Sequence, residues 1–307
     1  TSLDDEHSMH LMRAEVPGPE ADKLVPKARA TARILYLMYF VLTAAEVVFL
    51  MFGGMSFYDA LLHSFSTAGT GGFDSLIHAF GSAGTGGFSN RNASVAYYDS
   101  AYIDGVITVF MILFGVNFNL YFLIRLKNWK DALKNEELHA YLGIIAGAVA
   151  IVTVNILGIY GNIVHAFRYA SFQVASVITT TGFCTADFNL WPELSKVVLL
   201  GIMVIGACAG STGGGIKVSR FLILVKSIKQ EVRRMLHPKA VTIVKINGKR
   251  VGNDTIRSVY IYFISYILVM MVSILLVSIN NFDFATTFSS VLTTLNNVGP
   301  GISMVGP

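Results

Sequence analysis

Apolar residues run almost unbroken through five stretches of the chain, and each stretch is long enough to cross a lipid bilayer. The runs occupy residues 34–54, 102–124, 138–160, 197–225 and 258–280. A transmembrane helix needs roughly 20 apolar residues, so each run predicts a spanning helix. Single polar residues such as Glu46 and Asn155 lie within the runs, which indicates helices packed in a bundle rather than lone anchors.

Three shorter amphipathic segments lie between or after these runs, and each leads into a loop rich in Ser, Thr, Asn or Gly. They are HSFSTAGTGGF (63–73), NIVHAFRYASFQVASVITTTGF (162–183) and DFATTFSSVLTTLNNVGPG (283–301). The helical part of each is too short to span and too apolar for a free loop, which predicts re-entrant pore helices. Irregular backbone survives at membrane depth only where it is buried in protein or lines a water-filled cavity. Gly lets consecutive carbonyls face one axis, as in a filter for a monovalent cation.

The hexamer AGTGGF occurs twice, at Ala68–Phe73 and at Ala83–Phe88. Two separate pore units need spanning helices of about 20 residues between their loops, so only one copy can belong to the filter. The flanking sequence does not choose between Gly72 and Gly87. The remaining copy either lies in the outer vestibule or is a tandem duplication.

The fourth apolar run contains the sequence GACAGSTGGGIK at residues 206–217, which interrupts its helical pattern. A phosphate-binding loop would place Lys directly after its last Gly, whereas here Ile216 stands between Gly215 and Lys217. Both flanks are apolar and helical in pattern. We therefore predict a discontinuous membrane helix whose unwound middle faces the pore.

Composition and charge strengthen the membrane interpretation. Hydrophobic residues make up 53% of the chain and charged residues 14%, with a mean hydropathy of +0.59, far more apolar than a soluble domain. Twenty of the 23 Lys and Arg residues lie before the first run, after the second, or between Lys217 and Arg257. This positive-inside pattern predicts a cytoplasmic amino terminus and two cytoplasmic linkers, and it argues against a nucleic-acid site. Cys184 and Cys208 are predicted to be packing residues.

Four motifs together resemble the TrkH/TrkG and KtrB group of bacterial potassium-uptake proteins. They are LMRAEVPGPEADKLVPKAR, TTTGF, GACAGSTGGGIKV and LNNVGPG, in the family's order over nearly the whole chain. The resemblance implies an all-α integral membrane fold in which helix–pore helix–filter loop–helix units surround one central pore, as in potassium channels. It also implies K+ as the transported ion with no covalently bound cofactor, a homodimer, a cytosolic nucleotide-binding ring of the TrkA/KtrA type, and a place in the bacterial inner membrane.

The same resemblance assigns two groups of site residues. The ion-binding filter would be formed by Thr70, Gly71, Gly72, Thr85, Gly86, Gly87, Thr180, Thr181, Gly182, Asn297, Val298 and Gly299. The intramembrane gate would be formed by Gly210, Ser211, Thr212, Gly213, Gly214, Gly215 and Lys217. The ammonium of Lys217 would lie near the permeation path, where its repulsion of cations could help to hold the closed state.

On the family plan the chain divides into a linker and three pore units. Residues 1–33 would be the cytosolic linker, 34–135 a unit with the doubled segment at 63–88, 136–245 a unit with the broken helix, and 246–307 a shortened last unit. The family's first unit has no counterpart here. We therefore expect the sequence to be a portion of a larger protein.

Potassium uptake through a gated, carbonyl-lined filter is the expected function, and a sodium-preferring or weakly selective transporter is the alternative. A membrane enzyme would need convergent acids, a nucleophile with its base, or a metal cluster, and the sequence shows none. Asn117 and Asn119 either line the cavity below the filter or make interhelical hydrogen bonds. His63, His78 and His165 are predicted to mark the starts of pore helices, and Gly143 and Gly147 to mark close helix packing.

Overall fold

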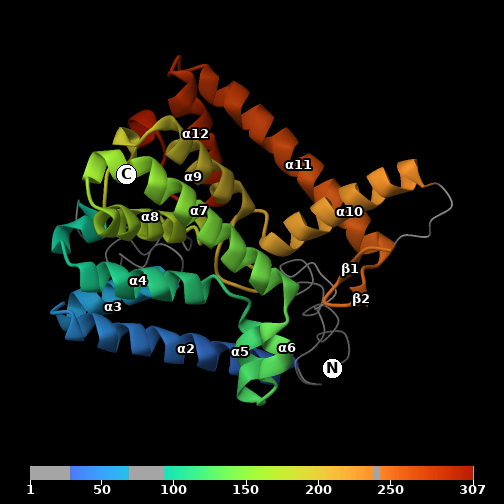
Figure 1. Ribbon diagram of the computed structural model, residues 1–307, viewed down its shortest axis with the longest axis horizontal. Helices are drawn as coiled ribbons and strands as arrows, with labels where there is room; N and C mark the ends of the chain where they lie inside the picture. Colours follow the sequence, from blue (N-terminus) through green and yellow to red (C-terminus); the bar gives the residue numbers. More distant parts are fainter. Residues whose placement is uncertain (1–27, 69–92, 238–242, 307) are drawn as a thin grey trace.

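The computed structural model describes residues 28–68, 93–237 and 243–306, and the regular structure in them is almost entirely helical (Figure 1). The helices are α2 (Ala28–Phe52), α3 (Phe57–Ala68), α4 (Ala101–Phe114), α5 (Phe118–Arg125), α6 (Trp129–Leu133), α7 (Glu136–Tyr160), α8 (Ile163–Ile178), α9 (Glu193–Ile205), α10 (Val218–Leu236), α11 (Asn253–Ser278) and α12 (Phe284–Asn296). Single 3-10 turns are η1 (Ser94–Tyr98), η2 (Phe188–Leu190) and η3 (Ser303–Val305). Strands β1 (Lys245–Ile246) and β2 (Lys249–Arg250) form an antiparallel hairpin.

Within the described residues, α7 and α11 are each long and apolar enough to cross a membrane. Helices α4 and α5 meet the same criteria only as a pair, and they are bent by 88° at the break between them. The spanning helix predicted over residues 102–124 is therefore not continuous but broken into two helices. The break ends at Asn117, the residue before α5. Its side-chain Oδ1 accepts a hydrogen bond from the backbone N–H of Asn119 (3.0 Å). Asn117 is thus a helix cap.

The predicted interruption of the fourth run is confirmed, because α9 ends at Ile205 and α10 begins at Val218. The predicted short helices are present as α3, α8 and α12, with 12, 16 and 13 residues. Helix α3 begins earlier than expected, at Phe57, so His63 lies inside it and does not mark its start. His165 lies in the first turn of α8, as predicted, and His78 lies outside the described residues.

Asn or Asp residues begin the helices that follow the loops. The side chains of Asn135, Asn162 and Asp283 accept backbone N–H groups at the starts of α7, α8 and α12. Hydrogen bonds from the hydroxyl and the backbone N–H of Thr286 lower the pKa of Asp283 below its usual value. This cap therefore stays ionised at neutral pH and is lost only when the pH falls through that lowered pKa.

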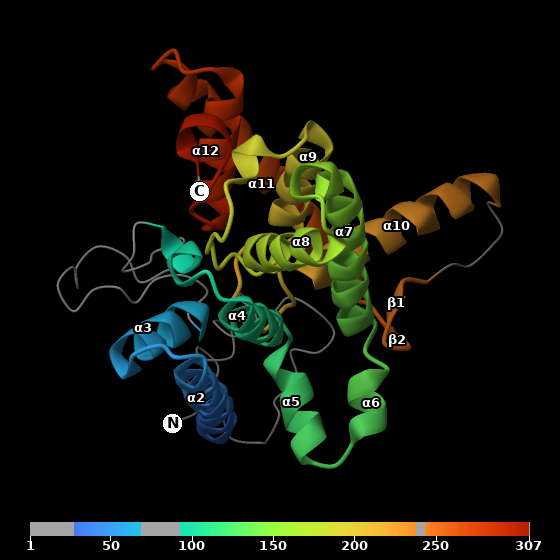
Figure 2. The ribbon, with the colours of Figure 1, turned by 60° about the vertical axis from the view of Figure 1, so that its left-hand side comes forward.

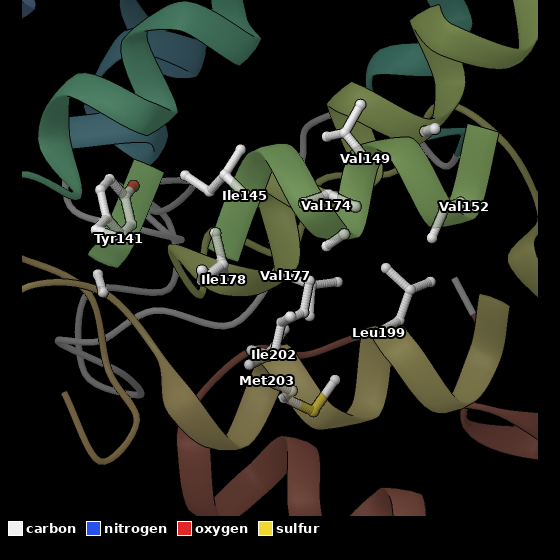
Figure 3. Packing of buried hydrophobic residues seen from close by; sticks show 14 of the residues in the cluster. Tyr141, Ile145, Val149, Val152, Val174, Val177, Ile178, Leu199, Ile202 and Met203 are labelled. Atoms are coloured by element: carbon white, nitrogen blue, oxygen red, sulfur yellow. The ribbon is translucent and has the colours of Figure 1, made fainter. Parts of the chain in front are cut away.

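The elements form three groups, and the short helix α8 lies at their centre. Figures 1 and 2 show α2, α3 and α4 on one side, α7, α8 and α9 in the middle, and α11 and α12 on the other. The middle group encloses the largest buried apolar cluster, in which Ile145, Ile178 and Met203 come from three different helices (Figure 3). A second cluster joins α2, α3 and α4 to Phe172 and Ala175 of α8.

The α4–α5 break packs against the end of α8 so closely that only glycine fits at position 115. A β-carbon on Gly115 would lie 2.1 Å from the hydroxyl oxygen of Tyr141 and 2.9 Å from Cγ2 of Thr179. The φ angle of Gly115 is −75°, so the requirement is steric and not conformational. Tyr141 is fully buried and its hydroxyl donates to the carbonyl of Ile112 (3.2 Å).

We expect Gly115→Ala to destabilise the protein by about 1–3 kcal/mol, as overpacking of a filled interior does. Adding Tyr141→Phe should recover part of that loss, because it removes the oxygen that the new methyl group meets. Thermal unfolding in detergent, followed for both single variants and the double variant, measures the coupling. Strictly additive effects would contradict the packing described here.

Candidate functional site

Helices α8 and α12, two of the three predicted pore helices, end with the same hydrogen-bond pattern. At the end of α8, the N–H of Thr180 donates to the carbonyl of Val177 (3.1 Å), and the N–H of Thr181 donates to that of Ser176 (2.9 Å). At the end of α12, the N–H groups of Asn297 and Val298 donate to the carbonyls of Thr294 (3.2 Å) and Thr293 (2.9 Å). Both are Schellman motifs, so two segments over a hundred residues apart end their helices in one way.

Left-handed backbone angles recur at alternate positions in these loops. The φ angles are +59° at Thr180 and +80° at Gly182, and they are +59° at Asn297 and +99° at Gly299. A strand points successive carbonyls to opposite sides, whereas alternating left- and right-handed residues turn them toward a common side. Thr180 is branched at Cβ, and such a residue at positive φ is a genuine outlier that its surroundings must hold in place.

The glycine loop, residues 206–217, supplies that support for Thr180. The backbone N–H of Gly214 donates to the Thr180 hydroxyl oxygen at 2.7 Å. A β-carbon on Gly214 would lie 2.4 Å from the carbonyl oxygen of Asn296, and one on Gly213 would lie 3.0 Å from that of Thr179. The glycine loop therefore contacts the ends of both α8 and α12, and its backbone can approach them because it lacks side chains there.

Backbone hydrogen bonds close the glycine loop into a compact turn. The N–H groups of Ile216 and Lys217 donate to the carbonyls of Val204 (3.2 Å) and Ile205 (2.9 Å) at the end of α9. The loop also reaches the α4–α5 break, where the Cys208 N–H donates to the Gly115 carbonyl (3.0 Å). The ammonium of Lys217 folds back onto the carbonyl of Gly213 in the same loop.

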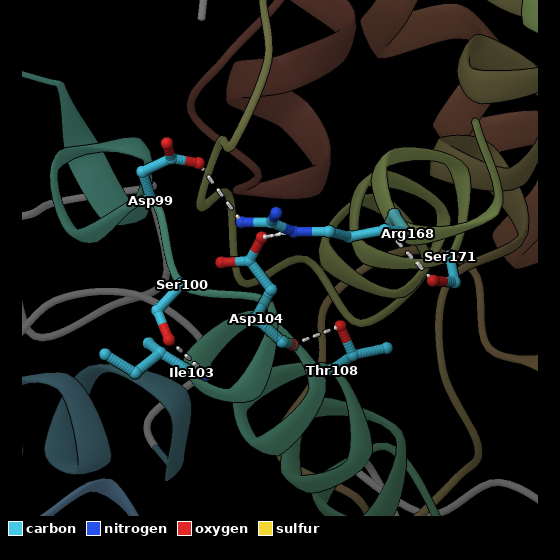
Figure 4. Close-up of polar contacts among 7 residues, drawn as sticks. All are labelled: Asp99, Ser100, Ile103, Asp104, Thr108, Arg168 and Ser171. Atoms are coloured by element: carbon cyan, nitrogen blue, oxygen red, sulfur yellow. Dashed lines mark hydrogen bonds and ion pairs between the residues drawn. The ribbon is translucent and has the colours of Figure 1, made fainter. Parts of the chain in front are cut away.

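An ion pair holds the start of α8 against α4. Nε of Arg168 lies 2.7 Å from Oδ2 of Asp104, whose side chain is only 3% exposed. One terminal nitrogen of Arg168 also lies 3.5 Å from the carboxylate of Asp99, which is 86% exposed. Figure 4 shows the guanidinium reaching from α8 to both carboxylates. The pair fixes the end of α8 opposite to its filter loop.

The described residues include only part of the predicted site. The residues predicted to form the filter lie in the two matching loops: Thr180, Thr181, Gly182, Asn297, Val298 and Gly299. The residues predicted to form the gate lie in the glycine loop: Gly210, Ser211, Thr212, Gly213, Gly214, Gly215 and Lys217. The structure brings Thr180 and Gly214 into direct contact. The remaining filter residues, Thr70, Gly71, Gly72, Thr85, Gly86 and Gly87, lie outside the described residues. Cys184 and Cys208 are both buried and unpaired with each other, as predicted.

Sequence reasoning missed Glu137, a carboxylate at the start of α7 that contacts the glycine loop. Its Oε1 accepts backbone N–H groups from Ala209 (2.7 Å) and Ser219 (3.1 Å). In the sequence NEEL it resembles an ordinary acidic residue in the first turn of a helix. A β-carbon on Gly143 or Gly147 would meet no described atom within 4 Å, so the described residues contain no helix packed closely against either glycine.

A protein-family model described as "TrkH: Cation transport protein" matches residues 3–141 and 138–304. The chain belongs to this family. The match and the helical structure confirm the resemblance drawn from the four motifs and the all-α fold expected from it.

Individual proteins and one solved structure also match this chain over nearly its whole length. The Trk system potassium uptake protein TrkH of Salmonella typhimurium is 38% identical over 301 residues, which are 97% of this chain and 59% of that protein. The Trk system potassium uptake protein TrkG of Escherichia coli K12 is 34% identical, over 95% of this chain and 58% of that protein. The crystal structure of the potassium transporter TrkH from Vibrio parahaemolyticus superposes with a TM-score of 0.84 at 34% identity, covering 97% of this chain and 61% of that one. The chain thus spans about three fifths of the length of these relatives.

We expect Asp104→Asn to lower the thermal stability of the protein, because it leaves the Arg168 guanidinium without its buried counter-charge. Breaking a buried pair costs up to about 3–5 kcal/mol, and the partial exposure of Arg168 should bring the loss nearer to 1–3 kcal/mol. Asp99→Asn is the matched control, since an exposed pair contributes about 0–1 kcal/mol. Equal melting temperatures for the two variants would contradict a stabilising role of the buried pair.

Proposed function

We propose that this chain forms part of a potassium uptake pathway in the bacterial inner membrane, with its amino terminus in the cytoplasm. Ions would pass a filter lined by backbone carbonyls, and the glycine loop would gate their passage. The observation that carries the proposal is the shared geometry of two pore loops, left-handed at Thr180 and Gly182 and again at Asn297 and Gly299. We propose that this backbone points its carbonyls toward one axis, and rings of carbonyls are how a channel replaces the hydration shell of a cation.

The spacing of helix and glycine favours the first copy of AGTGGF as the third filter loop. Gly72 follows the first residue of α3, Phe57, by 15 residues, and Gly299 follows that of α12, Phe284, by 15. In the longer helix α8, Gly182 follows Ile163 by 19 residues. Gly87 lies 30 residues after Phe57, beyond both spacings. We therefore assign Gly72 to the filter and leave Gly87 outside it.

The contacts of the glycine loop support its role as a gate. It is a stretch of irregular backbone that interrupts a predicted membrane helix, which is tolerated only where it is buried in protein or lines a cavity. It also touches Thr180 in one pore loop and approaches Asn296 at the start of the other. Its backbone could therefore obstruct ions that have passed those loops.

The proposal extends to the proteins that this chain binds and to the kind of activity it has. The relatives are named as proteins of a Trk system. From the family resemblance we also propose a homodimer and a cytosolic nucleotide-binding ring of the TrkA/KtrA type. Large apolar side chains of α11 such as Ile264, Leu268 and Leu275 are exposed and suit contact with lipid or a further helix. The role is transport and not enzymatic catalysis.

We expect Gly182→Ala and Gly299→Ala to reduce the preference for potassium over sodium by about tenfold, the ratio that roughly 1.4 kcal/mol represents. A β-carbon at positive φ costs about 1–2 kcal/mol, which would distort the carbonyl positions without unfolding the helices. The matched control is Gly143→Ala, at a helical position where the new methyl group meets open space. Paired potassium and sodium flux in proteoliposomes, made with the protein from the complete reading frame, gives the ratio. A ratio unchanged from that of the control would overturn the filter assignment.

Potassium itself should stabilise the protein if the loops bind it. A ligand present at 100 times its dissociation constant adds about 2.7 kcal/mol to stability. We therefore expect potassium and rubidium to raise the melting temperature in detergent above the value in choline, and sodium to do so less. A larger effect of sodium than of potassium would instead favour a sodium-preferring transporter.

A further inference from the structure

One buried carboxylate, that of Glu137, is among the groups outside the glycine loop that hold it. Glu137 is 4% exposed, and its Oε1 accepts one N–H from inside the loop, at Ala209, and one from the first turn of α10, at Ser219. Ala209 lies within the loop, and Ser219 lies just after its end. One oxygen atom therefore ties both the loop and the start of α10 to α7.

This carboxylate also serves as a cap for α10. The residue before α10 is Lys217, whose φ is +80° and whose side chain makes no capping hydrogen bond. The first N–H groups of a helix need an acceptor from elsewhere, and Glu137 supplies one for Ser219. Negative charge is favoured at a helix N-terminus, and Glu137 lies at two of them, those of α7 and α10.

Neighbouring contacts fix the helix turn that carries Glu137. The backbone N–H of Glu136 donates to Oδ1 of Asn247 at 2.7 Å, in the turn between β1 and β2. The carboxylate of Glu136 pairs with Lys226 of α10, whose ammonium also donates to the carbonyl of Lys245 (2.8 Å). The start of α7 is therefore anchored to the hairpin and to α10, so Glu137 is presented to the loop from a rigid base.

We propose that Glu137 is the positioning residue that holds the glycine loop in its closed position beneath the pore loops. The inference rests on the proposed gating function of that loop. Opening requires the N–H groups of Ala209 and Ser219 to leave the carboxylate, and the closed state is stabilised by both charge-assisted hydrogen bonds. Weakening these two hydrogen bonds shifts the loop toward the open state. The described hydrogen bonds of Glu137 do not involve the pore loops, so the pore loops keep their geometry.

The test uses Glu137→Gln, which keeps the shape and one acceptor oxygen but removes the charge. Hydrogen bonds to charged groups are about twice as strong as neutral ones, so we expect resting potassium flux to rise at least about fivefold with an unchanged potassium-to-sodium ratio. A residue needed only for folding would lower the flux instead. The matched control is Glu193→Gln, in the first turn of α9, where an exposed carboxylate pairs only with Lys196 among the contacts described.

A second measurement reports on the loop without relying on flux. Cys208 lies in the glycine loop and is fully buried, so its thiol should react slowly with a methanethiosulfonate reagent in the wild type. Burial and the charge of Glu137 both disfavour ionisation of the Cys208 thiol, so labelling rates are compared per thiolate, from their dependence on pH. On that scale we expect faster labelling of Cys208 in Glu137→Gln and wild-type labelling in Glu193→Gln, with peptide mass spectrometry separating Cys208 from Cys184. Size-exclusion chromatography selects folded protein for each variant.

The two readouts separate the two hypotheses. Unchanged labelling of Cys208 in folded Glu137→Gln protein overturns the role of Glu137. Faster labelling without any gain in flux supports Glu137 as the residue that positions the loop and counts against the loop as the gate. Faster labelling with raised flux supports both.

Discussion

Backbone groups at the ends of short helices must find hydrogen-bond partners inside the protein, and this requirement organises the centre of the molecule. A helix that stops within an apolar environment leaves N–H or carbonyl groups that water cannot reach. Helices α8 and α12 satisfy theirs through Schellman turns, in which Thr180 and Asn297 adopt left-handed angles. Helix α10 satisfies part of its need through the carboxylate of Glu137. The pore loops and the glycine loop are shaped by these solutions.

Close packing of backbone on backbone explains why glycine is concentrated where these elements meet. A methyl group on Gly214 would fall 2.4 Å from the Asn296 carbonyl, and one on Gly206 would fall 2.4 Å from the Gly214 carbonyl. Neither contact can be relieved by rotating a side chain, since both partners are main chain. Glycine in this loop therefore serves close approach as much as flexibility, and a larger residue would separate the loop from the pore loops.

The sequence predicted the elements with strong local signals and missed those that depend on distant partners. The limits of the broken helix and the short helices α8 and α12 follow from apolar runs and from clusters of Gly, Ser, Thr and Asn. The bend after Gly115 was missed because apolar residues continue on both sides of it and a single Gly is common in membrane helices. Glu137 was missed because its partners lie 72 and 82 residues further along the chain. The doubled AGTGGF segment lies outside the described residues, and only its spacing from α3 bears on it.

Thr180 links the loop after α8 to the glycine loop in physical terms. A β-branched residue at a φ of +59° carries strain of about 1–3 kcal/mol, and such strain persists only where neighbouring contacts over-determine the conformation. One of those contacts is the hydrogen bond from Gly214, which belongs to the glycine loop and not to the pore loop itself. The glycine loop also approaches the end of α8 at a second point, where Gly213 lies against the carbonyl of Thr179. The strained angle of Thr180 is therefore held both by the Schellman turn of α8 and by a neighbouring segment of the chain.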